Sequence, residues 1–359
     1  MAIIIGLIAL LWNIKPIKKG EYYEDNFSQN QTNSLKGVFA LFVILHHLCT
    51  YLADYFPSFY TYKYLGFLMV GGFFLISGYG LTYGVIHKSG YLNGFLKTRL
   101  PAILIPYYII CIFNFVANHI SGTLNLRYII FSLFGITMWY IAVIVGLYLM
   151  FYICFKFFRQ KTALTLVSIG TALYILGMFA VHRIFSKYNI YAKTGLPEFG
   201  FWWYNSVICF LLGIWYCKLK SKIDAIIQNK FLLYTLISFV ICAITYYFTC
   251  LHFNDGYTYI LICEIIASIA FTVLILAFTY KFKIKNPILD LFGNLSLELY
   301  LCHALFIFAW RSQITVFGIT LYIESNFLYF VFIMASSIVF SWLVHKASTH
   351  LIKAFKAKK

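Results

Sequence analysis

Ten stretches of the sequence are each long and apolar enough to cross a lipid bilayer as a helix. A transmembrane helix needs about 20 predominantly apolar residues. The ten stretches are residues 36–56, 64–87, 99–119, 137–158, 162–182, 200–217, 231–251, 258–280, 288–310 and 325–345. Charged residues make up only 11% of the 359 residues, against roughly 25% in an average soluble domain. We therefore predict an all-α polytopic membrane bundle with ten core transmembrane helices, and exclude a soluble enzyme, a disordered chain and a coiled coil.

The basic residues indicate how these helices are oriented. The chain has 28 Lys and Arg residues and a net charge of +17. When alternate loops are assigned to opposite sides of the membrane, 22 of the 28 fall on one side, which the positive-inside rule makes the cytoplasmic side. The other side holds only Lys63, Arg127, Arg183, Lys187, Lys193 and Arg311. The charge therefore reports orientation in the plasma membrane with a cytoplasmic C-terminus, and we exclude a nucleic-acid partner.

The chain divides into three parts along its length. Residues 1–35 contain a short apolar segment, residues 2–12, which is either an uncleaved anchor or an interfacial helix. The polar residues 20–34 are expected to form a flexible cytoplasmic link. Residues 36–346 form one membrane domain, and residues 347–359 are a basic cytoplasmic tail.

The nine cysteines all lie in or at the ends of the apolar stretches, and no C-x-x-C pair occurs. Cysteine in such positions behaves as a small apolar packing residue. We expect neither a disulfide framework nor a metal site.

Ionisable groups inside a bilayer are rare and mark candidate functional sites. Lys36 and His47 are eleven residues apart in the first core stretch. On a helix they share a face and lie about 16 Å apart along the axis. They could hold two ends of one long ligand, with an anionic group at Lys36 and the reacting centre at His47. Alternatively, Lys36 is an ordinary positive-inside flank and His47 forms an interhelical hydrogen bond.

Two neighbouring groups are weaker candidates. His46 points about 100° away from His47 and is favoured as a structural residue. Ser77, in a glycine-rich second stretch, lies at about the depth of His47. A Ser–His nucleophile pair is conceivable, although a Ser that bonds its own helix backbone explains the residue equally well.

Two carboxylates lie within later stretches. Glu298 is about eleven residues into the ninth stretch, and an imidazole is its expected partner because an unpaired buried carboxylate would protonate. His303 lies about 140° round the same helix. Glu264, in the eighth stretch, either binds a polar acceptor or anchors a helix.

Five short motifs in these stretches resemble those of the acyltransferase 3 family of integral-membrane acyltransferases. They are Lys36-x10-His47, Phe73-Phe74-Leu-Ile-Ser77-Gly78-Tyr79, Lys97-Thr-Arg99-Leu-Pro101, Trp139-Tyr140, and Ser296-x-x-x-Tyr300-Leu-x-His303. The resemblance runs from about residue 34 to 346. One departure is Ala102, where the family often has the second Arg of an Arg-x-x-Arg motif.

The resemblance implies transfer of an acyl group, commonly acetyl, from a cytoplasmic acyl-CoA to a hydroxyl of a sugar or glycan. A basic rim of Lys36, Lys97 and Arg99 suits the phosphates of coenzyme A. We predict that His47 is the general base and that Glu298 or Ser77 supports it. The candidates for substrate contact are His46, Trp139, Glu264 and His303. Acyl-CoA is expected as a donor substrate rather than a resident cofactor, with a cell-envelope saccharide and membrane lipids as the other partners.

Two other functions fit parts of the sequence. In a transporter or flippase for a saccharide or anionic substrate, Glu264, Glu298 and the histidines would be relay or binding groups. A binding or scaffolding protein would leave these buried groups without a role. A requirement for acyl-CoA distinguishes the enzyme from the transporter.

Overall fold

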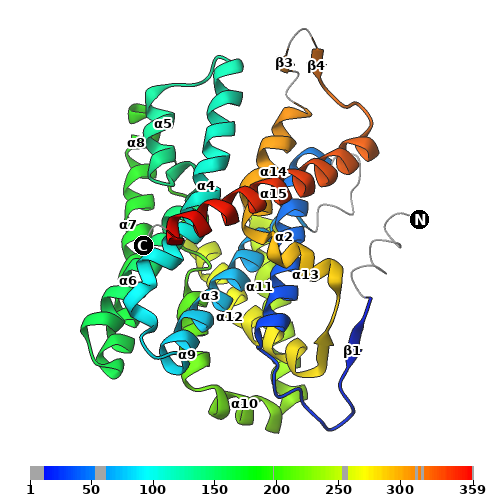
Figure 1. The fold of residues 1–359 in the computed structure, drawn as a ribbon. Coiled ribbons are helices and arrows are strands. Elements are labelled where there is room, and N and C mark those ends of the chain that lie inside the picture. Colours follow the sequence, from blue (N-terminus) through cyan, green and yellow to red (C-terminus); the bar gives the residue numbers. More distant parts are fainter. Residues whose placement is uncertain are drawn as a thin grey trace. The chain divides into compact units, whose positions relative to one another are not determined.

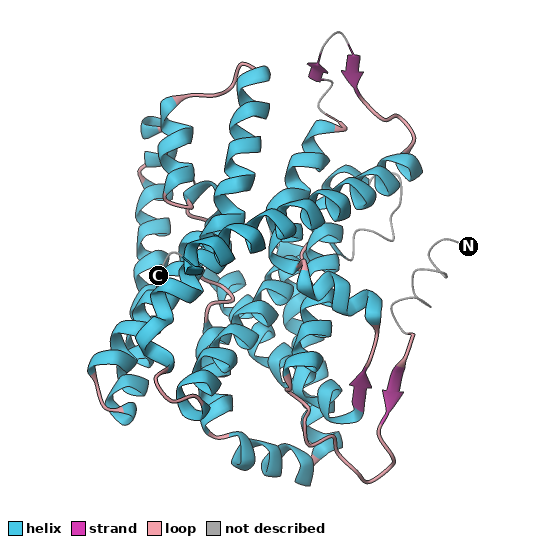
Figure 2. Cartoon of the chain, viewed as in Figure 1, coloured by secondary structure: helices cyan, strands magenta, loops and turns pink. Residues whose placement is uncertain are grey.

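The computed structural model describes residues 12–52, 62–196, 198–252, 258–311, 314–316 and 319–357. Helices dominate, and the strands in this part of the chain are three residues long (Figures 1 and 2). The all-α membrane bundle expected from the sequence is confirmed. The apolar segment 2–12 lies outside the described residues except for Trp12.

The chain forms two compact units, each described by itself below. The first unit contains the described residues of 1–39, 67–93 and 147–293. The second contains those of 40–66, 94–146 and 294–359. Helices α2 (Gln29–Leu52) and α6 (Trp139–Phe157) begin in one unit and end in the other.

The first unit otherwise contains β1 (Ile14–Pro16), most of α3 (Gly66–His87), η2 (Tyr91–Gly94), α7 (Gln160–Lys187), α8 (Ile190–Thr194), η4 (Phe201–Trp203), α9 (Ile208–Lys218), α10 (Lys220–Asn229), α11 (Phe231–His252), α12 (Thr258–Lys281), β2 (Phe282–Ile284) and α13 (Pro287–Asn294). The second contains α4 (Phe95–Ile120), α5 (Leu126–Leu133), η3 (Ile136–Met138), α14 (Ser296–Ala309), β3 (Ile314–Val316), β4 (Ile319–Leu321) and α15 (Asn326–Ala357).

The described residues include eight helices long and apolar enough to span a membrane, or nine if one bent pair is a single span. The exact count of ten is therefore not confirmed. The sixth expected stretch, 200–217, contains only the 11-residue helix α9 after the turn η4. An 11-residue helix extends about 16 Å, roughly half of the hydrocarbon core.

The bent pair lies in the ninth expected stretch, 288–310. Helices α13 and α14 are separated by a break at Leu295. The break follows Gly293 and Asn294, which are residues typical of helix ends. Glu298 consequently lies in the first turn of α14 and not in the middle of a continuous span.

Residues 20–34 make specific contacts within the first unit, and several of their polar side chains are buried. Gln31 is buried, donates to the carbonyl of Phe282 at 2.6 Å and accepts from the backbone N–H of Ile284 at 3.0 Å. The same segment leads from β1, which pairs antiparallel with β2 with Ile14 opposite Ile284. Gln31 is thus satisfied by the strand that follows α12.

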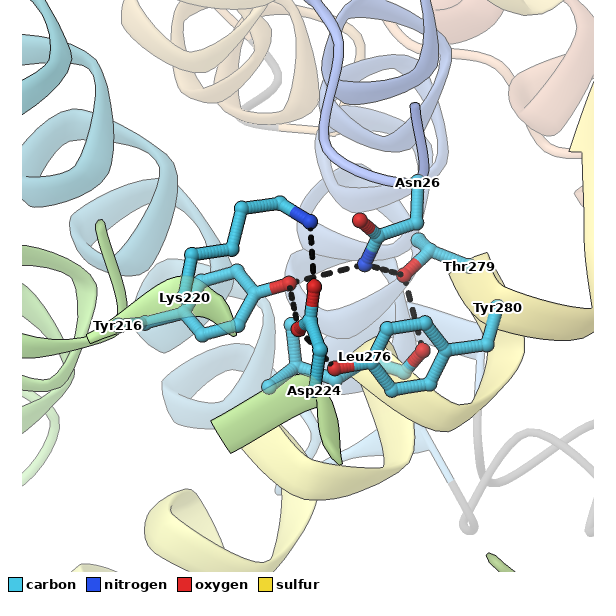
Figure 3. Close-up of polar contacts among 7 residues, drawn as sticks. All are labelled: Asn26, Tyr216, Lys220, Asp224, Leu276, Thr279 and Tyr280. Carbon is cyan, nitrogen blue, oxygen red and sulfur yellow. Dashed lines mark hydrogen bonds and ion pairs between the residues drawn. The ribbon is translucent and has the colours of Figure 1, made fainter. Parts of the chain in front are cut away.

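A second polar network in the first unit surrounds Asp224 of α10 (Figure 3). The hydroxyl groups of Tyr216 and Tyr280 donate to Oδ1 of Asp224 at 3.0 and 2.5 Å. Lys220 forms an ion pair with Oδ2 at 2.5 Å. The buried side chain of Asn26 donates to Tyr216 at 2.9 Å. The network thereby ties the segment before α2 to α9, α10 and α12.

Helices α3 and α9 of the first unit cross at a pair of glycines. A Cβ atom added at Gly78 would lie 2.0 Å from the backbone oxygen of Phe210, and one added at Gly213 would lie 2.1 Å from that of Leu75. Small residues permit such close backbone approach between membrane helices. Close approach of another backbone therefore explains the glycine that follows Ser77.

Replacing Gly78 with alanine is expected to destabilise the protein by about 1–3 kcal/mol, the usual range for overpacking a fixed contact. The contact is a backbone carbonyl and cannot rotate away. Gly80→Ala on the same helix is the matched control, because its added Cβ meets nothing within 4 Å. Thermal unfolding in detergent should show a lower midpoint for Gly78→Ala alone, and equal midpoints for both variants would contradict the close packing.

Candidate active site

The second unit contains a cluster of three imidazole rings, from His46, His47 and His303, which we call the imidazole cluster. The ring centroids of His46 and His47 are 4.7 Å apart, and those of His47 and His303 are 4.9 Å apart. Helix α2 supplies the first two residues and α14 supplies the third. The cluster therefore joins the first-stretch and ninth-stretch motifs of the sequence.

His47 is the accessible member of the cluster. Its side chain is exposed, whereas Ile44 and Leu48, on either side of it on α2, are fully buried. His46 is half-buried and His303 is only 3% exposed. His47 is therefore the ring of the cluster with the most accessible surface, and its two neighbours are more buried.

A backbone hydrogen bond fixes the orientation of His303. Its Nδ1 lies 2.9 Å from the carbonyl oxygen of Leu299. Because a carbonyl only accepts, Nδ1 carries the proton. The neutral ring then leaves Nε2 as an acceptor, and Nε2 is buried without a partner in the described structure. An unpaired buried acceptor costs about 1–3 kcal/mol, so a proton donor is expected to complete the site.

His46 is held in a similar way. Backbone carbonyls of Tyr62 and Lys63 hydrogen-bond to its ring, and its Nδ1 is buried without a partner. The ring packs tightly on Gly66, where an added Cβ would lie 2.6 Å from the His46 side chain. Both neighbours of His47 are therefore fixed by backbone contacts rather than by other charged side chains.

Aromatic rings extend the cluster toward α6. Tyr300 of α14 contacts His303 with ring centroids 6.1 Å apart, and Tyr140 contacts Tyr300 at 5.0 Å. The Trp139 ring is 6.1 Å from that of Tyr140. Trp139 itself is half-buried at the start of α6. The predicted substrate-contact residue Trp139 thus belongs to the same unit as the cluster.

Glu298 pairs with His345 of α15. His345 Nδ1 lies 2.9 Å from Glu298 Oε1, and Glu298 is only 4% exposed. Glu298 thus has the imidazole partner expected from the sequence, but that partner is His345 and not one of the cluster histidines. Glu298 also shares helix α14 with His303 of the cluster.

The basic residues predicted to bind the donor lie on two helices. Lys36 and His47 are both on α2, which is continuous from Gln29 to Leu52 as expected. Lys97 and Arg99 lie near the start of α4 in the second unit, where Lys97 is exposed and Arg99 is half-buried. Their part in donor binding stays a prediction.

The two remaining candidates, Ser77 and Glu264, belong to the first unit. Ser77 is half-buried on α3. Glu264 of α12 is 2% exposed, and Asn205 donates to its Oε2 at 3.1 Å. Asn205 was not singled out from the sequence, although the Asn205-Ser206 pair is the polar interruption in the sixth apolar stretch.

The fold and the imidazole cluster define a polytopic helical membrane protein with a site suited to general acid–base chemistry. A family model described as an acyltransferase domain matches residues 30–346. The chain therefore belongs to the acyltransferase 3 family, and acyltransferase activity in general follows from this membership. Comparison with curated proteins and with solved structures finds no match.

Proposed function

We propose that the protein transfers an acetyl group from cytoplasmic acetyl-CoA to a hydroxyl of a cell-envelope saccharide, with His47 as general base. The observation that carries the proposal is the exposed His47 ring in contact with two less exposed imidazoles. A neutral imidazole accepts a proton near neutral pH. We place the protein in the plasma membrane with its C-terminus in the cytoplasm, on the strength of the distribution of basic residues.

In the proposed reaction, His47 removes the proton from the acceptor hydroxyl as the hydroxyl oxygen attacks the thioester carbonyl. The C–O bond forms, the carbonyl oxygen becomes an oxyanion, and the C–S bond then breaks. The proton held by His47 passes to the departing thiolate, so that the products are the O-acetyl ester and free coenzyme A. General-base assistance of this kind contributes about 10²–10⁴-fold to a rate.

Lys36, Lys97 and Arg99 are proposed to bind the phosphates of acetyl-CoA. Arginine is well suited to this because its planar guanidinium can form two parallel hydrogen bonds to one phosphate. Ala102 stands where the family pattern often has a second arginine. More of the phosphate binding is therefore expected to fall on Arg99.

Replacing Arg99 with glutamine is therefore expected to raise the KM for acetyl-CoA by about tenfold or more, with a smaller change in kcat. The basis is the roughly 1.5–3 kcal/mol of a hydrogen bond to a charged group. Arg159→Gln, which removes an exposed basic residue of the first unit near the start of α7, is the matched control. An unchanged KM in Arg99→Gln would remove this residue from the donor site.

Transfer is tested by incubating membranes that contain the protein with acetyl-CoA labelled in the acetyl group. The proposal predicts alkali-labile label in the saccharide fraction, and none with membranes that lack the protein. Label that stays in acetyl-CoA or appears only as free acetate would refute acyl transfer to a saccharide.

A transporter is the second candidate, favoured by the buried Glu264–Asn205 pair of the first unit. Buried ionisable groups of this kind often line substrate pathways. A transporter would move saccharide across proteoliposomes without acyl-CoA. The enzyme proposed here requires acyl-CoA for any change to the saccharide.

A further inference from the structure

Arg311 lies just beyond the C-terminal end of α14, among aromatic rings of the second unit. Its guanidinium carbon lies 4.5 Å from the ring centroid of Tyr329 and 5.5 Å from that of Tyr322. Its Nη1 donates to the Tyr322 hydroxyl at 3.4 Å and its Nη2 donates to Asn326 Oδ1. Trp310 precedes it and packs on Phe332 with ring centroids 5.6 Å apart.

Two hydrogen-bond donors in the cluster formed by Trp310, Arg311 and Tyr322 have no acceptor in the described structure. Arg311 Nε and Trp310 Nε1 are both buried and unpartnered in the described structure. The described residues also provide no carboxylate that forms an ion pair with Arg311. A buried donor without an acceptor costs about 1–3 kcal/mol. An acceptor that carries negative charge would satisfy this group best.

The group lies on the same helix pair as the imidazole cluster. Tyr51 is one turn beyond His47 on α2, and Tyr51 contacts both Phe308 of α14 and Tyr329 of α15. Arg311 is eight residues beyond His303, about 12 Å along the helix direction. The distribution of basic residues assigns Arg311 to the outer side of the membrane. A short oligosaccharide could therefore reach from Arg311 to His47.

The chemistry of the group indicates what it would bind. Aromatic faces offer apolar surface to a sugar ring, and the guanidinium fork matches a carboxylate or phosphate. We propose that Arg311, with Trp310 and Tyr322, binds the acceptor and selects a saccharide that carries an anionic substituent. This inference rests on the proposed acyl transfer, since it assigns the acceptor side of that same site.

A purely local role for Arg311 is the competing explanation. A cation at the C-terminal end of a helix is favourable through the helix dipole, and the bonds to Tyr322 and Asn326 hold the segment after α14 in place. Such a role affects folding stability and does not distinguish anionic from neutral sugars. Discrimination between sugars therefore separates the two explanations.

The test is equilibrium binding of three sugars to the full-length protein in lipid nanodiscs. The probes are methyl glucuronide, glucose 1-phosphate and methyl glucoside, which present a carboxylate, a phosphate and no charge. We expect at least one anionic sugar to bind about tenfold or more tightly than methyl glucoside. Arg311→Gln should abolish this preference. Arg127→Gln should keep it, because Arg127 is an exposed basic residue of the same unit assigned to the same side.

Preference for only one of the two anions supports the proposal and identifies the substituent. Equal binding of all three sugars by the wild type, no detectable binding of any of them, or an Arg311→Gln preference equal to that of Arg127→Gln would each overturn it. Thermal unfolding of both variants checks that they fold. The binding assay contains no acyl-CoA and is independent of the transfer assay. Loss of the anion preference with acyl transfer intact would refute the acceptor site alone. Loss of acyl transfer with the anion preference intact would refute the proposed function alone.

Discussion

Replacing His47 with alanine is expected to lower the rate of acyl transfer by about 10²–10⁴-fold, the contribution of a positioned general base. His47 is the most exposed ring of the imidazole cluster, and the rings of His46 and His303 both contact it. Neither neighbour can replace it without movement, because backbone carbonyls hold both rings. The O-acetyl content of envelope saccharides from cells that express each variant, measured by NMR, reports the effect.

His119→Ala is the control for His47→Ala. His119 is an exposed histidine of the second unit in the last turn of α4, and nothing in the imidazole cluster touches it in the described structure. This variant should retain wild-type O-acetylation. If His47→Ala inserted at normal levels and O-acetylated as well as His119→Ala, His47 would not be the base.

Replacing His303 with alanine is expected to lower kcat by about tenfold to a hundredfold while the KM for acetyl-CoA stays nearly constant. The bond from Nδ1 to Leu299 leaves Nε2 as a fixed acceptor beside His47. We infer that His303 is a positioning residue that orients the His47 ring and its proton. Loss of a group that orients a catalytic histidine affects the chemical step more than binding.

The conservative variant His303→Gln separates this role from packing. A glutamine side chain fills part of the ring volume and can present an oxygen acceptor, so it should recover part of the lost kcat. The pH dependence of kcat should also change in His303→Ala, since the partner of the base is removed. If His303→Ala lowered expression or thermal stability but left kcat unchanged, the role of His303 would be limited to packing.

The helical architecture follows from the sequence because the bilayer imposes it. Long apolar stretches must form helices to satisfy their backbone groups, and nine of the ten expected stretches correspond to single helices or to the bent pair. The common helix of Lys36 and His47, and the close backbone approach at Gly78, were likewise predictable from spacing and residue size.

Breaks within apolar stretches were harder to predict. Hydropathy is averaged over about 19 residues. Short polar segments that interrupt two of the predicted helices therefore do not stand out from the apolar residues around them. Gly293 and Asn294 end α13, and Ser296 begins α14. Asn205 and Ser206 precede α9, where Asn205 binds Glu264. These residues are of the types that usually end or begin helices.

Contacts between distant helices could not be predicted from periodicity. The sequence indicates that Glu298 requires a partner, but the helix packing alone brings His345 to it from 47 residues away. The same packing brings His303 against His47. The alternation of loops placed Arg311 on the outer side, but its aromatic surroundings come from α15 and the segment before it.

The most direct test of the central claim is chemical rescue of the purified His47→Ala variant. Transfer of labelled acetyl from acetyl-CoA to envelope glycan is measured in nanodiscs with and without added imidazole. If His47 is the general base, transfer falls to about one hundredth of the wild-type rate or less, and imidazole restores part of it. A His47→Ala protein that transfers acetyl at the wild-type rate without imidazole would contradict the account.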